Sequence, residues 1–276
     1  MNIITVSRLV GSYGDEIAAN VAESMKLEFI GRNALHELAM SCDPEYSDAC
    51  ALYETEHGPG FFERLFFNRS AYKSLFEALA FEQASRGNVV IVGRGAQIAL
   101  HNLPGVFSLG VVAPLELRIQ RIMLRNSLSK EDAAYFVDKH DRDRRRLMKA
   151  VFDRDTDDWS LYDLVINTSH FSAEAATEVV IRGIEKIERA SDVSSVKDRL
   201  KGMALAKRIE ALIKKKMTSA IARHVEIHTE PGGIVRITGV ISEKAAKDKV
   251  GRIVGDYPGV AKVENELKVT ELSFSV

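Results

Sequence analysis

Short apolar runs alternate with stretches of helical periodicity over the first 190 residues of the chain. The apolar runs predict strands at Ile3–Ser7, Leu27–Ile30, Asn88–Gly93, Val106–Val112 and Tyr162–Thr168. Three of them contain almost no polar residue, which is typical of strands that helices cover on both faces of a parallel sheet. Strands that alternate with helices form βαβ units. The pattern therefore predicts a three-layer α/β domain with a mainly parallel sheet.

The segments between these runs repeat apolar residues at helical spacing. Ile17, Val21 and Met25 predict a helix directly after the opening loop. Pro114 suits the first helical position of "PLELRIQRIMLRN". Ser129 and Asp132 resemble the N-terminal cap of the next helix. The segment "SAEAATEVVIRGIEKIE" predicts the last helix of this domain.

A phenylalanine-rich segment, "HGPGFFERLFFNRSAYKSLFEALAFEQA", precedes the strand at Asn88–Gly93 and is predicted to be helical after its Gly-Pro-Gly break. It gathers Phe61, Phe62, Phe66, Phe67 and Phe76. We interpret this cluster as core packing or as the contact of a homodimer. An aromatic pocket for a nucleobase is the alternative.

The pattern changes after about residue 190. Small polar residues in "ASDVSSVK" predict a linker at 191–199, which separates a first domain at 1–190 from a second at 200–272. The second domain begins with an amphipathic helix, continues with a hairpin around Glu-Pro-Gly-Gly, and has a second helix that Ser242 is expected to cap. Its last strand places on one face Val263, Leu267 and Val269. This α-β-β-α-β order predicts a small α+β domain.

Composition narrows the range of partners. The 38 basic and 39 acidic side chains nearly cancel, so no overall field draws the chain to nucleic acid or to an anionic membrane. Cys42 and Cys50 form neither a disulfide framework nor a zinc-ligand pattern. We see no signal peptide and no apolar run of the roughly 20 residues that span a bilayer. These features predict a cytoplasmic protein without a nucleic-acid partner.

The opening loop, "SRLVGSYGDEIAANVA", connects the first strand to the first helix. A helix N-terminus leaves backbone N–H groups unpaired and attracts anions. Glycines let the backbone approach a phosphate closely. The candidate phosphate-binding residues are Gly11, Ser12, Tyr13, Gly14 and Asp15. Taken alone, the loop is compatible with a phosphate site and equally with a structural turn.

The loop departs from the phosphate-loop pattern GxxxxGK[ST]. In that register Arg8 stands at the first glycine, Gly14 at the lysine and Glu16 at the hydroxyl that holds magnesium. Arg8 is expected to offer the positive charge that the lysine normally brings, although a guanidinium and an ammonium are not equivalent there. No spacing of carboxylates or histidines identifies metal ligands.

Five segments of the first domain, in the correct order, resemble the cytidylate kinase-like family. They are "ITVSRLVGSYGDEIAANVAESMKLEFIGR", "VVIVGRGAQIAL", "VVAPLELRIQRI", "DRDRRRLMKAVF" and "LYDLVINTS". The loop of that family usually reads S-R-x-x-G-S-G-G-x-x-I-A and likewise lacks the lysine. The resemblance implies the fold of the P-loop nucleoside monophosphate kinases, with a lid over the phosphates.

The same resemblance implies transfer of the γ-phosphate of ATP, with Mg²⁺, to a CMP-like nucleoside monophosphate or a related small phosphorylated acceptor. Three residues depart from the family pattern. Tyr13 replaces a glycine of the loop, Gly31 stands at a usually acidic position, and Gly95 replaces the aspartate of a Gly-Arg-Asp segment. The alternatives are a catalytically inactive nucleotide sensor that signals through the second domain, and a purely structural assembly protein.

Four more arginines complete the expected site. Arg142 and Arg144 fall on the family's Asp-Arg-x-Arg lid pattern, which implies closure over phosphates. Arg32 and Arg94 are expected to bind the acceptor, and Arg94 follows the end of a central strand, where ligands collect in α/β sheets. Arg94 is alternatively a surface arginine. The lid segment is alternatively a solvated helix face with the pairs Asp138–Arg142 and Asp141–Arg145.

Residues of about 200–270 resemble the BON domain in their Gly-rich hairpin and in the Gly-Val before the last strand. The family is associated with phospholipid or membrane-surface attachment. The lysines at 214–216 are able to meet anionic lipid, and they equally suit the C-terminal end of a helix dipole. We rank a regulatory contact with a protein partner above membrane binding.

Overall fold

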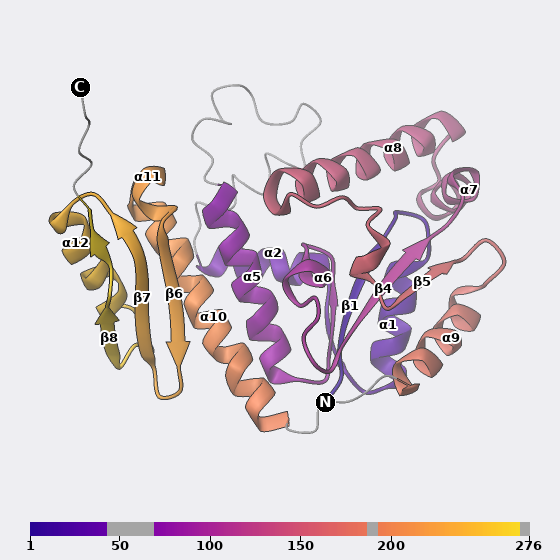
Figure 1. The fold of residues 1–276 in the computed structure, drawn as a ribbon. Coiled ribbons are helices and arrows are strands. Elements are labelled where there is room, and N and C mark those ends of the chain that lie inside the picture. The colour runs from indigo at the N-terminus through magenta and orange to yellow at the C-terminus, as the bar shows by residue number, and fades with distance from the viewer. Residues whose placement is uncertain (43–68, 187–192, 271–276) are drawn as a thin grey trace. The chain divides into compact units, whose positions relative to one another are not determined.

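The computed structural model describes residues 1–42, 69–186 and 193–270 (Figure 1). The chain divides into two compact units. The first unit comprises Met1–Phe67 and Arg86–Val193, and the second comprises Asn68–Ser85 and Ser194–Val276. The second unit therefore contains a helix from the middle of the sequence. The domain boundaries predicted at residues 190 and 200 stay a prediction.

The first unit is built on a five-stranded sheet. Its strands are β1 (Ile3–Arg8), β2 (Glu28–Ile30), β3 (Val89–Val92), β4 (Val106–Val112) and β5 (Leu164–Asn167). They lie in the order β2-β3-β1-β4-β5, and every neighbouring pair is parallel. The predicted α/β class and the parallel sheet are confirmed.

The longer helices of the first unit fall where the sequence predicts them, except the helix over 32–42, and the short helix over 96–99 was not predicted either. The helices of this unit are α1 (Gly14–Ser24), α2 (Arg32–Cys42), α6 (Ala96–Ala99), α7 (Leu115–Asn126), α8 (Lys130–Leu147), which continues into the π-turn η1 (Met148–Phe152), the 3₁₀ turn η2 (Trp159–Leu161), and α9 (Ala173–Lys186). The Ser129 hydroxyl accepts a hydrogen bond from the Asp132 N–H at 3.1 Å, so the predicted cap of α8 is confirmed. Pro114 is the N-cap of α7, one position before its first helical residue.

One face of the sheet shares a core with α1 and α9. Val6 of β1, Leu109 of β4 and Ile166 of β5 pack in one cluster with Ile17 of α1 and Val180 of α9, and all five are buried. On the opposite face the alternate side chains of the central strands are buried as well, which explains why these strands read as continuous apolar runs.

The second unit contains α5 (Arg69–Arg86, except its last residue), α10 (Val193–Lys216, except its first residue), α11 (Ser219–Ala222), β6 (Val225–Glu230), β7 (Ile234–Ile241), α12 (Lys244–Gly255), β8 (Lys262–Asn265) and β9 (Lys268–Val269). β6 and β7 form the predicted antiparallel hairpin, and β8 pairs with β7 in parallel. The predicted α-β-β-α-β order is confirmed, with the last strand broken in two.

Three details of the second unit differ from the sequence prediction. α10 begins at Val193, so most of the stretch predicted as linker is helical. The N-cap of α12 is Glu243 rather than Ser242. Val269 is exposed, whereas Leu267 is buried and Val263 packs against the core of this unit as predicted.

The phenylalanine-rich segment is described only in part. Phe61, Phe62, Phe66 and Phe67 lie outside the described residues. Phe76 is buried in α5, and its ring centroid lies 4.5 Å from that of Tyr72. For this phenylalanine, core packing within the second unit is the observed arrangement.

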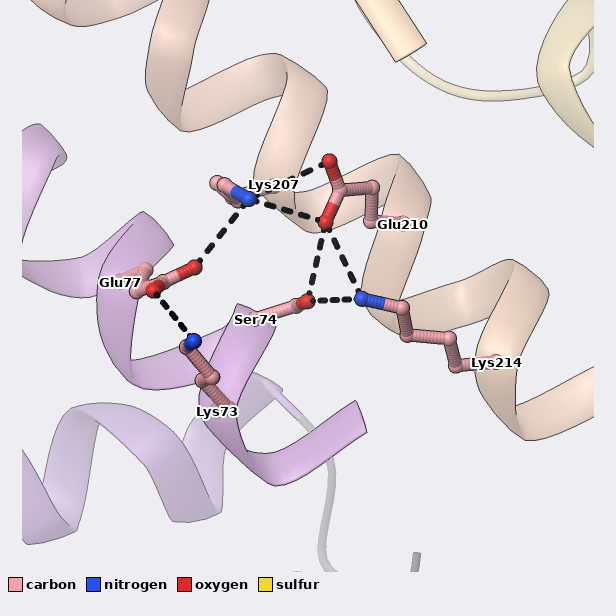
Figure 2. A network of polar contacts seen from close by, with 6 residues as sticks. All are labelled: Lys73, Ser74, Glu77, Lys207, Glu210 and Lys214. Carbon is pink, nitrogen blue, oxygen red and sulfur yellow. Dashed lines mark hydrogen bonds and ion pairs between the residues drawn. The ribbon is translucent and has the colours of Figure 1, made fainter. Parts of the chain in front are cut away.

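Polar side chains join α5 to α10 (Figure 2). The Lys207 ammonium lies 3.2 Å from Glu77 and 3.1 Å from Glu210. Glu210 also accepts hydrogen bonds from Lys214 at 3.2 Å and from the Ser74 hydroxyl at 3.1 Å. Burial opposes the charged form of Glu210, but the two lysines outweigh it and lower the pKa of its carboxyl. The network therefore favours the fully ionised state of its members.

A second ion pair strengthens the same helix contact. Arg208 of α10 donates two hydrogen bonds to the Glu82 carboxylate of α5, both at 2.7 Å. Bidentate pairs of this kind fix geometry as well as charge.

Within the described residues, no helix has the length and apolar content that crossing a bilayer requires.

The substitution Glu210→Gln is expected to destabilise the full chain by about 1–3 kcal/mol, because it leaves two partly buried lysines without their shared carboxylate. Urea unfolding followed by circular dichroism measures the change. Asp198→Asn is the matched control, since Asp198 forms an exposed pair with Lys201 on the same helix, and it should stay within about 0.5 kcal/mol of the unaltered chain. Equal effects of the two substitutions would contradict a stabilising role of the network.

The unaltered chain and the Glu210→Gln variant also test the direction of the pKa shift of the Glu210 carboxyl. A carboxyl whose pKa is lowered by folding stabilises the folded state above the unfolded value, about 4.3 for glutamate, and this contribution disappears as the pH falls through the folded value. The stability difference between the unaltered chain and Glu210→Gln should thus be constant near neutral pH and shrink below about pH 4. A difference that grows under acid conditions would show that the pKa is raised instead.

Candidate functional site

A cavity of about 400 Å³ lies in the first unit at the carboxyl ends of β1 and β3. Ser7 and Arg8 border it where β1 ends, and the segment from Gly93 to Gly95, together with Gln97, borders it after β3. Residues of α8 form another wall. In open α/β sheets, ligands bind outside the carboxyl ends of the strands, where neighbouring connections diverge. The cavity occupies that position.

The wall of the cavity is strongly cationic. It contains six basic side chains, Arg8, Arg32, Arg94, Arg125, Lys139 and Arg144, and three acidic ones, Asp15, Asp141 and Asp143. The surplus of positive charge in a concave site favours an anionic ligand. Because the chain as a whole is nearly neutral, this local concentration is not visible in the composition.

Arg8, which the sequence singled out, crosses the beginning of α1. An added Cβ at Gly14 would lie 2.3 Å from the Cβ of Arg8, so Gly14 is required for the arginine to pack there. The guanidinium is held by the Asp15 carboxylate, with Nη2 at 2.7 Å and Nε at 2.9 Å from Oδ1. A ligand phosphate that binds Arg8 therefore competes with Asp15.

The structure separates the two lid arginines. Arg144 lines the cavity and donates a hydrogen bond from Nη2 to the Ser7 hydroxyl at 3.0 Å. Arg142 forms an exposed i,i+4 pair with Asp138 at 3.1 Å and does not line the cavity. The surface pair Asp138–Arg142 is thus observed, and only Arg144 is placed with Arg8.

The electrostatics of Arg144 reflect this crowded position. Burial is the largest influence and lowers the pKa of its guanidinium, and the nearby Arg8 lowers it slightly further. Tyr162, Asp141 and Asp157 act in the opposite direction. An anion bound between Arg8 and Arg144 would relieve the repulsion between the two cations.

The loop residues occupy places that the sequence did not reveal. Of Gly11 to Asp15, only Asp15 lines the cavity. The Ser12 hydroxyl is buried and lies 2.7 Å from the Leu9 carbonyl oxygen and 3.1 Å from that of Val111, so it stabilises the turn and does not line the cavity. Tyr13 adopts a left-handed conformation with φ 66°, and its ring lies under the guanidinium of Arg121 at 3.7 Å.

The two predicted acceptor residues, Arg32 and Arg94, both line the cavity. Gly95 follows Arg94 with φ 77°, and an added Cβ there would lie 2.4 Å from the Phe152 ring. The Phe152 side chain thus excludes an aspartate at position 95 unless the ring moves. The position of this ring is compatible with the glycine that stands at the aspartate of the Gly-Arg-Asp pattern in this chain.

Sequence reasoning missed two buried polar residues. Arg118 of α7 donates to both carboxylate oxygens of Asp141, at 2.9 and 3.2 Å, and to the Ala113 carbonyl at 3.1 Å. The predicted pair Asp141–Arg145 is therefore replaced by Asp141–Arg118. Gln97 is 3% exposed, and within the described chain its Oε1 has no hydrogen-bond partner. The rotation of its helix decides where each of these side chains points. The residues near Arg118 and Gln97 in the sequence do not indicate that rotation.

No group of three or more metal-ligating side chains converges in the described part of the chain. The cavity nevertheless contains the carboxylates of Asp15 and Asp143. Magnesium in phosphate-transfer sites is usually held by one or two carboxylates together with the phosphates and water. Such a donor set fits an ion that arrives bound to a nucleotide.

The first unit is thus an α/β domain with a parallel sheet and an arginine-lined cavity at the carboxyl ends of its strands. Residues 3–170 match the family model described as the cytidylate kinase-like family, and the chain belongs to that family. Residues 205–271 match the BON domain. The two resemblances seen in the sequence are thereby confirmed.

Individual relatives agree with this assignment. A cytidylate kinase of Pyrococcus horikoshii is 28% identical over 71% of this chain and 95% of its own length. A cytidylate kinase of Methanocaldococcus jannaschii is 29% identical over 68% of this chain and 99% of its own. Among solved structures, an uncharacterised protein from Eubacterium ventriosum has a TM-score of 0.52 at 19% identity and covers 68% of this chain and all of the other.

The substitution Asp15→Asn is expected to tighten the binding of inorganic pyrophosphate about threefold to tenfold, because the ligand no longer displaces a carboxylate from Arg8 or meets its negative charge. Calorimetric titration without divalent metal measures the affinity. Asp138→Asn, which alters the ion pair of Arg142 outside the cavity, is the control and should leave it unchanged. An unaltered or weaker affinity of Asp15→Asn would show that the Arg8–Asp15 pair does not compete with the ligand.

Proposed function

We propose that this protein is a nucleotide kinase that transfers the γ-phosphate of ATP to a nucleoside monophosphate, CMP or a closely related acceptor. The observation that carries the proposal is the convergence of Arg8 and Arg144 in a cationic cavity within the family-matched region. The relatives named cytidylate kinases support the nucleotide class.

Phosphoryl transfer requires positioning and positive charge more than covalent participation of the protein. An oxygen of the acceptor phosphate forms a bond to the γ-phosphorus of ATP while the bond from that phosphorus to the β–γ bridging oxygen breaks, and ADP leaves with the bridging electrons. Arg8 and Arg144 are placed to stabilise the charge on the transferred group. Arg32 and Arg94, which also line the cavity, are assigned to the acceptor phosphate.

Magnesium bound to ATP would neutralise part of the phosphate charge. Asp143 is the available carboxylate for it, whereas Asp15 is engaged by Arg8. The base of the acceptor is less constrained by these residues, since Phe152 fills the place of the aspartate of the family pattern.

The rival function is nucleotide binding without catalysis, reported through the BON region. The absence of the loop lysine and the pairing of Arg8 with Asp15 favour it. For the BON region we infer a protein contact rather than a phospholipid surface. Lys214, one of the three lysines considered for lipid binding, is bound by Glu210 and Ser74 within the second unit.

The substitution Arg144→Met is expected to lower kcat/KM about 100-fold in a coupled assay with ATP and CMP, since one charged donor to the transition state is lost. Arg142→Met is the matched control two residues away and is expected to retain nearly full activity. Thermal unfolding of both variants checks that the fold is unchanged.

Three results would contradict parts of this assignment. Equal losses in the two variants would remove the special role of Arg144. ATP binding by the unaltered chain, without transfer to any nucleoside monophosphate, would favour the sensor. Absence of nucleotide binding by the unaltered chain would contradict both the kinase and the sensor function.

A further inference from the structure

The carbonyl groups of three consecutive loop residues accept hydrogen bonds from three side chains, of which Arg118 and Thr168 are buried and Arg121 is half-buried. The three hydrogen bonds run from Arg118 Nη1 to the Val10 oxygen at 3.3 Å, from Arg121 Nη1 to the Gly11 oxygen at 3.2 Å, and from Thr168 Oγ1 to the Ser12 oxygen at 2.9 Å. The two arginines belong to α7, and Thr168 follows β5. Side chains of two separate segments thus hold the same loop.

This anchoring determines where the peptide N–H groups of the loop point. In a trans peptide the N–H is directed opposite to the C=O of the same unit, so the N–H groups of Gly11, Ser12 and Tyr13 face away from the anchoring side chains. The Ser12 N–H bonds the Leu9 oxygen at 3.2 Å. Within the described chain, those of Gly11 and Tyr13 have no acceptor. Neither residue lines the cavity, so these two N–H groups are unpaired donors on the loop beside it.

The two arginines differ in net charge. Arg118 is neutralised by its bidentate pair with Asp141. Arg121 has no carboxylate partner among the described residues. Its donors are directed to Gly11, to the Thr168 hydroxyl at 2.9 Å and to the Thr168 carbonyl at 2.7 Å, and its flat face covers the Tyr13 ring. Arg121 is therefore an uncompensated positive charge behind the loop.

We propose that Arg121 and Thr168 are positioning residues for the binding of a polyphosphate at the opening loop. They orient its peptide groups, and Arg121 supplies from the carbonyl side the positive charge that a lysine at position 14 would bring from the ligand side. A guanidinium bound to a carbonyl also polarises the peptide, which strengthens the N–H on its other side as a donor. The inference rests on the proposed function, since it assigns how that site binds the phosphates of ATP.

The close approach of α7 is built into the loop. Gly11 has φ 77°, and an added Cβ would lie 2.8 Å from the backbone oxygen of Arg118. A side chain at position 11 would therefore push α7 away and break the anchoring bonds. An arginine that served only to hold helix and loop together would satisfy the same geometry. The test must accordingly separate charge from packing.

The test is calorimetric titration of the full chain with inorganic tripolyphosphate at several salt concentrations between about 50 and 200 mM. The variants are Arg121→Gln, which removes the charge, Arg121→Lys, which keeps the charge without the forked donors, and Thr168→Val, which removes the hydroxyl at nearly constant volume. Arg182→Gln is the matched control, because Arg182 lies on α9 in an exposed pair with Glu185.

We expect Arg121→Gln to weaken binding roughly tenfold or more and to reduce the dependence of affinity on salt by about one charge. Arg121→Lys should keep the salt dependence and recover part of the affinity. Thr168→Val should keep the salt dependence and lose about threefold in affinity. Arg182→Gln should match the unaltered chain.

Unchanged binding by Arg121→Gln and Thr168→Val would overturn the inference and leave the proposed function intact. A lysine variant no better than the glutamine variant, with unaltered salt dependence in both, would reduce Arg121 to a packing role and would also overturn it. If Arg121→Gln does not fold, the inference is tested with Arg121→Lys and Thr168→Val, by their affinity for tripolyphosphate and by the salt dependence of that affinity. Absence of binding by the unaltered chain would overturn the polyphosphate site itself, and with it the proposed function.

Discussion

The buried guanidinium of Arg118 is the interaction on which the candidate site depends. It joins the Val10 carbonyl of the opening loop, the Ala113 carbonyl before α7 and the Asp141 carboxylate of α8. A charge at 5% exposure is costly unless its hydrogen bonds are satisfied, and breaking such a pair typically costs about 3–5 kcal/mol. Here the donors at Nε and at both terminal nitrogens have partners. The loop and α8 therefore hold a defined position relative to α7.

The position of α8 in turn decides which arginines meet a ligand. Asp141 faces Arg118, and Arg144, one turn further along the helix, faces Ser7 and the cavity. Arg142 lies between them in sequence but about 100° and 200° from them around the helix axis, so it projects to solvent. In the standard phosphate loop a lysine concentrates the positive charge at one point, whereas in this chain the charge is distributed over three arginines. Arg8 and Arg144 stand on the cavity side, and Arg121 stands behind the loop.

The fold of the first unit was largely predictable, because a strand buried on both faces must be apolar throughout. Val106–Val112 was predicted with the observed bounds for this reason. The site was predictable only as far as residue type. Arg8, Arg32, Arg94 and Arg144 do line one cavity, yet nothing local distinguished Arg144 from Arg142, since the rotation of α8 is set by the distant Arg118. The buried direction of the Ser12 hydroxyl follows likewise from the carbonyl of Val111, a residue of another strand.

In the second unit, too, the local sequence did not reveal contacts with distant residues, and here those contacts involve a whole helix. α5 lies inside the sequence matched by the cytidylate kinase-like family, yet its contacts group it with α10. The sequence of α5 looks like an ordinary helix with apolar residues on several faces, and its polar partners, Lys207 and Arg208, lie more than 120 residues away. Periodicity reports that a helix buries a face but does not report which segment covers it. A boundary that is clear along the sequence therefore need not coincide with a boundary between compact units. In this chain α5, which residues of the BON-matched segment hold by ion pairs, is followed directly by β3, the strand that ends at the cavity.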